Sequence, residues 1–125
     1  MTAVLVAFAG GLGSLARYAV GIASQRALGD RFPFGTLLVN LAGCFAIGLF
    51  VVTFELRQVD PRVRVAVVGG FLGGFTTYSA FAYETLALAE RRSLTAAALY
   101  SGVTVVGCFL ACATGIAVAR HLIGD

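Results

Sequence analysis

The sequence predicts an all-α integral membrane protein with four transmembrane helices, the third of which is broken. Three observations predict this class. Hydrophobic residues make up 59% of the chain and charged residues only 12%, whereas a typical soluble domain has about 25% charged residues. Four apolar stretches reach the length of about 20 residues that spans a bilayer. The chain also has 16 glycines, which suits closely packed membrane helices.

The four predicted spans follow one another with short connections and form one domain, residues 1–125. They cover residues 3–24, 34–54, 62–90 and 94–121. Pro33 and Pro61 stand just before the second and third spans, where proline is tolerated because the first helical N–H has no partner. Most charged residues lie in the connections, which are too short to fold as domains.

Three strongly polar residues are predicted at membrane depth: Arg17 in the first span, Asn40 in the second and Glu84 in the third. With the helical rise, Asn40 lies roughly 9 Å and the other two roughly 10–13 Å from the adjoining connections. All three enter from the side that bears the first and third connections, so they can line one aqueous vestibule. Ionisable groups at this depth are costly and indicate function. The alternative is an Arg17–Glu84 ion pair with an inter-helix hydrogen bond from Asn40.

The third span contains a glycine-rich stretch followed by two threonines. The sequence there has Gly69, Gly70, Gly73 and Gly74, then Thr76 and Thr77. The two GxxxG spacings permit a close helix crossing. Glycine followed by a capping threonine also predicts a helix that breaks and restarts near the midplane, which would expose carbonyls to a cation. Beyond it, Tyr78 and Phe81 share a face whose ring edges can meet an anion; ordinary packing is the alternative.

Polar side chains recur every four residues on two further spans. The second span carries Thr36, Asn40 and Cys44, and the fourth carries Tyr100, Thr104, Cys108 and Cys112. Residues four apart share a helix face, so each set forms a stripe that either joins helices or lines an ion path. The odd number of cysteines argues against a disulfide framework. No nucleophile–base pair is evident, and we expect no enzyme activity.

The arginines are balanced between the two sides of the membrane. One side carries Arg57, Arg62, Arg64 and Arg120, and the other carries Arg26, Arg31, Arg91 and Arg92. Orientation normally follows such counts, so this balance gives no preferred orientation. Either another signal sets one topology, or copies insert both ways and pair antiparallel. The net charge of +3 is spread over the connections, so we expect no nucleic-acid partner.

Three glycine-containing motifs stand in the first three spans: GGLGSLARY at residues 10–18, GTLLVNLAG at 35–43 and GFLGGFTTYSAF at 70–81. They resemble the motifs of the CrcB/Fluc family of fluoride channels. The resemblance extends in order through all four spans. It implies an antiparallel dual-topology homodimer in the lipid bilayer of a prokaryotic inner membrane. It also implies passive, selective fluoride export that lowers cytoplasmic fluoride toxicity.

The resemblance further implies roles for individual residues. The expected fluoride path comprises Arg17, Asn40, Thr77, Tyr78, Phe81, Glu84, Tyr100, Thr104 and Cys108. Backbone carbonyls of Gly73 and Thr76 are expected to hold a structural Na⁺ at the dimer interface, and no organic cofactor is expected. Two positions depart from the family pattern: Tyr78 stands where phenylalanine is usual, and Cys108 stands where serine or threonine is common.

Two other functions compete with a fluoride channel. A small multidrug-type proton-coupled exporter has the same size and dual topology, but it relies on a glutamate in the first span. Here the first span carries Arg17, which would repel a cationic drug. A non-transporting assembly factor would have no need of a broken, polar third helix.

Overall fold

The structure is a computed structural model that describes residues 1–124; the last residue of the predicted domain, Asp125, lies outside the described residues. Its elements are α1 (Thr2–Leu28), α2 (Phe34–Leu56), α3 (Pro61–Arg64), the π-helix η1 (Val65–Leu72), α4 (Gly73–Phe75), α5 (Tyr78–Arg91) and α6 (Leu94–Ile123). Together, α3 to α5 form one interrupted span. Residues 1–124 therefore contain four helical stretches able to cross a membrane and no strand, which confirms the predicted class.

The helices extend further into the connections than the sequence predicted. Helix α1 continues to Leu28 and so includes Arg26, and α2 continues to Leu56 and so includes Glu55. Helix α6 likewise ends at Ile123. A prediction that ends each helix where the apolar residues end therefore ends these helices too early. The backbone hydrogen bonds continue past the apolar stretch. A basic residue in the last turn, such as Arg26 in α1, interacts favourably with the negative end of the helix dipole and so stabilises this extension.

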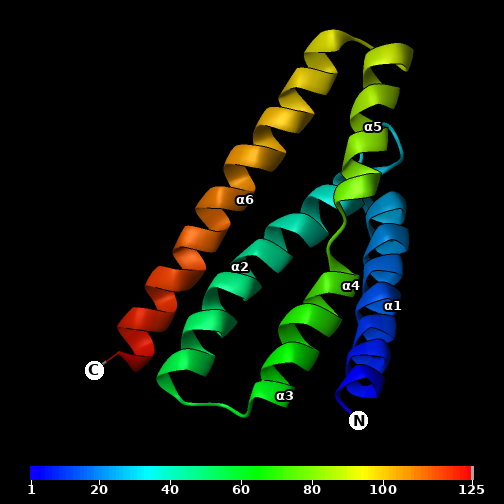
Figure 1. Cartoon of the computed structure of the whole chain (residues 1–125). Coiled ribbons are helices and arrows are strands. Elements are labelled where there is room, and N and C mark those ends of the chain that lie inside the picture. Colours follow the sequence, from blue (N-terminus) through cyan, green and yellow to red (C-terminus); the bar gives the residue numbers. More distant parts are fainter. Residues whose placement is uncertain (125) are drawn as a thin grey trace.

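The four spans alternate in direction (Figure 1). Helix α1 and the interrupted third span run one way, and α2 and α6 run the other way. Both termini lie at the same end as the connection between α2 and α3. The most extensive packing is between α2 and α6, followed by that of α1 with η1 and α4. The molecule therefore contains two closely packed helix pairs: α2 with α6, and α1 with the first half of the third span. The interruption of the third span follows directly after that half.

Glycines bring α1 unusually close to the first half of the third span. A methyl group added to Gly74 would overlap the carbonyl oxygen of Gly10, and one added to Gly13 would overlap the carbonyl of Phe71. A methyl group on Gly70 would come within 2.9 Å of the Ala9 side chain. The Gly70–Gly74 spacing therefore serves the close helix crossing that such spacing permits.

The backbone interruption lies at the threonines, not at the glycines. Gly73 is still helical, whereas Thr76 has ψ 160° and Thr77 has φ −152° and ψ 120°, both extended. The Thr77 Oγ1 accepts a hydrogen bond from the Ala80 N–H at 3.3 Å and caps α5. This confirms a broken third helix restarted by a threonine cap. The break lies at the threonine end of the predicted glycine–threonine stretch, and Gly70 and Gly74, which pack on α1, stay helical. We call Thr76 and Thr77 the break.

Candidate functional site

A cavity of about 360 Å³ lies against the break and collects most of the predicted path residues. Its lining includes Asn40, Cys44, Gly73, Thr76, Thr77, Tyr78, Phe81, Thr104, Cys108 and Phe109. These residues come from α2, both halves of the third span and α6. The polar stripes of α2 and α6 therefore face a common space, which we call the break cavity.

Asn40 holds the break in place from α2. Its Nδ2 donates to the Thr77 carbonyl at 2.9 Å, and its Oδ1 accepts from the Thr77 N–H at 2.8 Å. An extended residue loses its helical partners, and unpaired buried backbone groups are costly. The Asn40 side chain replaces both partners at once. The predicted inter-helix bond from Asn40 is therefore present. The amide nitrogen has two N–H groups, and only one of them is used in the contact with Thr77.

Thr104 lines the break cavity and carries an unpaired hydroxyl. The residue is only 4% exposed, and within the described residues its Oγ1 has no hydrogen-bond partner. A buried hydroxyl without a partner costs free energy. Thr104 lies one turn before Cys108 on α6, and both line the cavity. This arrangement offers a hydrogen-bond donor to a small acceptor in the cavity.

Two aromatic rings stand at the start of α5. The rings of Tyr78 and Phe81 meet edge to face, with centroids 5.6 Å apart and an interplanar angle of 71°. Phe81 is 8% exposed and also packs on Tyr100, with centroids 5.4 Å apart. Tyr78 is 80% exposed, and Phe109, another residue that lines the cavity, is 76% exposed. The break cavity is therefore open on the side where these two rings stand.

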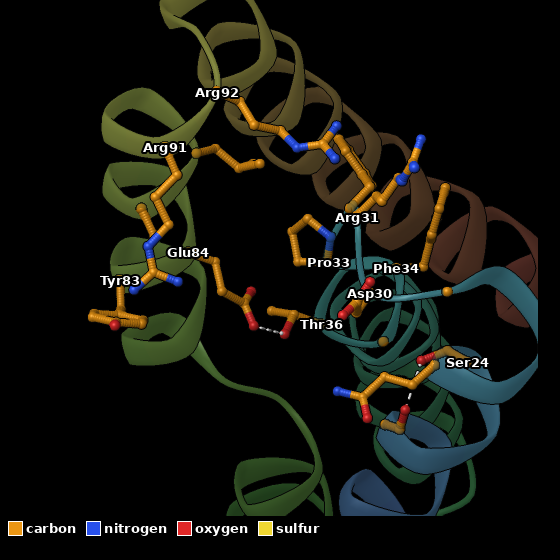
Figure 2. Close-up of a pocket in the computed structure, with 17 residues that line it drawn as sticks. Ser24, Asp30, Arg31, Pro33, Phe34, Thr36, Tyr83, Glu84, Arg91 and Arg92 are labelled. Carbon is orange, nitrogen blue, oxygen red and sulfur yellow. Dashed lines mark hydrogen bonds between the residues drawn. The ribbon is translucent and has the colours of Figure 1, made fainter.

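Glu84 is the centre of a second polar group, closer to the first and third connections. Its Oε1 accepts a hydrogen bond from the Thr36 hydroxyl and its Oε2 accepts one from the Tyr100 hydroxyl, each at 2.8 Å. Figure 2 shows the carboxylate of α5 pointing toward Thr36 of α2. Charge-assisted bonds of this kind are stronger than neutral ones. They join three helices around one carboxylate.

Glu84 also lines a larger cavity of about 460 Å³, which we call the vestibule cavity. Figure 2 shows the arginines Arg31, Arg91 and Arg92 around it, from the first connection and the end of α5. Asp30 and Glu84 are the carboxylates in the same lining. Positive charge therefore exceeds negative charge here, and such a surface raises the local concentration of anions.

The three polar residues predicted to share one vestibule are separated in the structure. Glu84 lines the vestibule cavity, Asn40 lines the break cavity, and Arg17 lines neither. The alternative Arg17–Glu84 ion pair is also absent: in residues 1–124 the ion pair formed is Arg64–Glu55, at 3.1 Å. The hydrogen bonds that the Glu84 carboxylate accepts come from Thr36 and Tyr100 instead. Arg17 is half-buried on α1.

The break frees a backbone carbonyl at Gly73. In a continuous helix, the Gly73 carbonyl would accept from the N–H of Thr77 four residues later. That N–H instead donates to Asn40. Thr76 is extended, so its own carbonyl has left the helix as well. Both residues line the break cavity. Carbonyls of an unwound segment are ligands that suit a sodium ion.

Sequence reasoning missed some partners that the fold supplies. Thr36 and Cys44 appeared only as members of a stripe, but Thr36 binds Glu84 and Cys44 lines the break cavity beside Cys108. Phe32 was assigned to a connection, yet its ring packs edge-on against Tyr100, with centroids 5.3 Å apart. The matched four-residue spacings on α2 and α6 were the available signal for the first two. No local pattern marked Phe32.

Comparison with known proteins identifies the family. Residues 4–116 match the family described as "CrcB-like protein, Camphor Resistance (CrcB)". A relative from Anaeromyxobacter sp. (strain K), named "Fluoride-specific ion channel FluC", is 46% identical over 97% of each chain. Relatives with the same name from Rhizobium johnstonii and Acidobacterium capsulatum are 44% and 40% identical, over 96% and 94% of this chain and 97% and 95% of theirs. These names denote channels, which agrees with the expectation that the chain is not an enzyme. The resemblance predicted from the three motifs is thus confirmed: the chain belongs to the CrcB family.

Proposed function

We propose that this chain is a subunit of a fluoride-specific ion channel that lets fluoride leave the cell passively. The family membership and the printed names of its relatives support this proposal. The same comparisons give no support to a multidrug-type exporter, and the half-buried charged residue of α1 is Arg17 rather than a carboxylate. The single structural observation that carries the proposal is the unpaired Thr104 hydroxyl in the break cavity.

Fluoride suits this cavity because it is small, strongly hydrated and a strong hydrogen-bond acceptor. An anion that sheds its water needs donors along its way, as in other selective pores. Thr104 supplies a free hydroxyl, and Asn40 supplies the N–H that the break does not use. The edges of Tyr78 and Phe81 add partial positive charge. Cys108 adds a weak S–H donor, and Thr77 has a hydroxyl beside them that already accepts from Ala80.

The vestibule cavity is the proposed entrance. Its arginines draw anions toward the mouth, and the half-buried Arg17 adds positive potential from α1. Glu84 and Tyr100 then lie between the vestibule and the break cavity, since Tyr100 packs on Phe81. The Tyr100 or Thr36 hydroxyl could transfer its hydrogen bond from Glu84 to an arriving anion. The anion would then be passed inward along the polar stripe.

A second copy in the opposite orientation completes the proposed channel. The balanced arginines allow both orientations, and the break cavity opens where Tyr78 and Phe109 stand exposed. Residues Gly73 and Thr76 of each copy would offer carbonyl oxygens to one structural Na⁺ at the interface. The freed Gly73 carbonyl and the position of Gly73 at the break cavity fit that role. Such an ion would fix the two copies together. We place the dimer in a prokaryotic inner membrane.

Flux from liposomes tests the proposal directly. Purified protein should release fluoride from loaded vesicles and should leave chloride and an organic cation such as tetraphenylphosphonium inside. Thr104→Val removes the hydroxyl with little change in shape and should lower the fluoride rate by about tenfold or more. Thr114→Val is the matched control, because the Thr114 hydroxyl is exposed and bonded to Leu110 of its own helix. Equal rates for fluoride and chloride would contradict the proposal.

A further inference from the structure

The thiols of Cys44 and Cys108 are neighbours across the contact between α2 and α6. Both line the break cavity, and the Cys44 thiol lies within interaction range of the Cys108 thiol. Both cysteines are free and half-buried. The polar stripes of the two helices thus meet at the cavity: Asn40 and Thr104 line it, and one turn further along each helix Cys44 and Cys108 line it as well.

A second, independent feature shows that this space is suited to a ligand. Thr104, one turn from Cys108, lines the same cavity, and its buried hydroxyl has no partner in the described part of the chain. We propose that Cys44 and Cys108 form a binding site for a soft, two-coordinate metal ion, such as Hg²⁺, Ag⁺ or Cu⁺, and that its occupation blocks the ion path. The block rests on the proposed channel function, whereas binding of the metal does not.

The donor set selects this class of metal. Soft thiolate ligands select soft ions, and residues 1–124 place no third His, Cys, Asp or Glu beside the pair. Zinc takes four protein ligands in a structural site, so it is poorly served by two sulfurs. A linear two-coordinate ion is complete with them. Each thiol loses its proton on binding, so one HgCl₂ and two thiols give one dithiolate complex, two protons and two chloride ions.

The site is accessible to such a ligand because the break cavity is open beside Tyr78 and Phe109. Molecular HgCl₂ carries no net charge, so the arginines of the vestibule do not exclude it. A metal held between α2 and α6 would occupy the turn next to Thr104, where the proposed fluoride path runs. The second thiol binds within one molecule and should strengthen binding about 100-fold over a single thiol.

Metal retention and flux, measured on the same purified protein, test the proposal. Wild-type protein treated with HgCl₂ and washed with excess 2-mercaptoethanol, a monothiol, should retain one mercury per chain by elemental analysis. Dithiothreitol, a dithiol, should remove it. Cys44→Ser and Cys108→Ser should each bind about 100-fold more weakly and lose the metal in the monothiol wash. Cys112→Ser is the control, because Cys112 lies one turn from Cys108 but outside the break cavity, and it should behave as wild type.

The mercury-loaded wild type and Cys112→Ser should carry fluoride at about a tenth or less of their own metal-free rate, and dithiothreitol should restore it. After the monothiol wash, Cys44→Ser and Cys108→Ser should each carry fluoride at their own metal-free rate. Equal retention by Cys44→Ser, or no retention by wild type, would overturn the metal site. Retention with undiminished flux would overturn its place on the path. Absence of fluoride flux from metal-free protein would instead count against the channel function, because retention is measured without transport.

Discussion

Asn40 binds both backbone groups of Thr77, donating to its carbonyl at 2.9 Å and accepting from its N–H at 2.8 Å. The amide of one helix thereby substitutes for two helical hydrogen bonds of another. This pairing accounts for the survival of extended backbone in the middle of a span, where exposed peptide groups are otherwise excluded. It also frees the Gly73 carbonyl that would have accepted from Thr77 in a continuous helix.

Asn40→Leu should abolish flux and destabilise the fold. The variant leaves the Thr77 N–H and carbonyl unpaired, at a cost of about 2–4 kcal/mol in the free energy of unfolding. Thermal unfolding in detergent and fluoride efflux from liposomes measure the two effects. Ser14→Ala is the control, because the Ser14 hydroxyl makes only a long 3.5 Å bond to the Gly74 carbonyl. If Asn40→Leu were as stable and active as Ser14→Ala, Asn40 would not hold the break.

Gly74→Ala should prevent folding, whereas Gly11→Ala should not. The added methyl group at Gly74 meets the Gly10 carbonyl, a backbone atom that cannot move without separating α1 from α4. At Gly11 a methyl group meets nothing within 4 Å, and alanine favours a helix by about 1 kcal/mol over glycine. The yield of monodisperse protein on size-exclusion chromatography compares the two. Similar yields would show that the close crossing is dispensable.

Tyr100→Phe and Glu84→Gln should be energetically coupled. The Tyr100 hydroxyl donates to the Glu84 carboxylate at 2.8 Å, and a bond to a charged group contributes about 1.5–3 kcal/mol against about 1 for a neutral one. A double-mutant cycle of unfolding free energies should therefore give a coupling of about 1 kcal/mol. Additive effects would mean that the contact contributes nothing beyond packing. Phe32→Leu serves as a control that alters the packing on Tyr100 and leaves its hydroxyl bonded.

Extra positive charge on one side should force one orientation. Gln58→Lys with Leu122→Lys adds two charges to the side of the termini, and Gln25→Lys with Thr95→Lys adds two to the other side. Each double variant alone should lose fluoride flux, because antiparallel pairs cannot form, and co-expression of the two should restore it. Gln58→Glu with Leu122→Glu is the control, since acidic residues contribute little to orientation. Full flux from either lysine variant alone would contradict antiparallel assembly.

The parts of this fold that could be predicted from sequence are those encoded locally. Apolar length predicts the four spans, and the capping preference of threonine predicts the restart at Thr77, where the structure places it. The position of the break depends on a contact between distant residues. Gly73 and Gly74 look like a break in sequence, but their helical backbone is set by the close packing of the same stretch on α1. Only the fold shows which glycine spacing is used for packing.

The site shows the same division. Four-residue spacing correctly grouped the residues of each stripe, so Asn40 and Thr104 face one cavity. Membrane depth alone grouped Arg17 with Glu84 and Asn40, and the structure separates them. Depth fixes a position along the membrane normal but not a direction around the helix, and Glu84 is hydrogen-bonded by Thr36 and Tyr100, not by Arg17. Partners on other helices, such as Thr36 for Glu84, require the tertiary register.

Phe81→Ile should lower fluoride flux by about tenfold or more, the effect of about 1.4 kcal/mol in the barrier. Phe81 lines the break cavity and packs against Tyr78 and Tyr100. Isoleucine keeps an apolar side chain there but removes the positive ring edge, so dehydration of the anion is no longer compensated. Leu88→Val is the matched control. Leu88 belongs to the same buried cluster and lines the vestibule cavity, not the break cavity. Because valine keeps an apolar side chain there and no ring edge is removed, the change should cost about 1 kcal/mol in stability without a comparable loss of flux. Flux is measured per amount of reconstituted protein, and size-exclusion chromatography checks that the variant is monodisperse. Near-normal flux from Phe81→Ile, with reduced stability like that of Leu88→Val, would assign Phe81 to packing and remove it from the ion path.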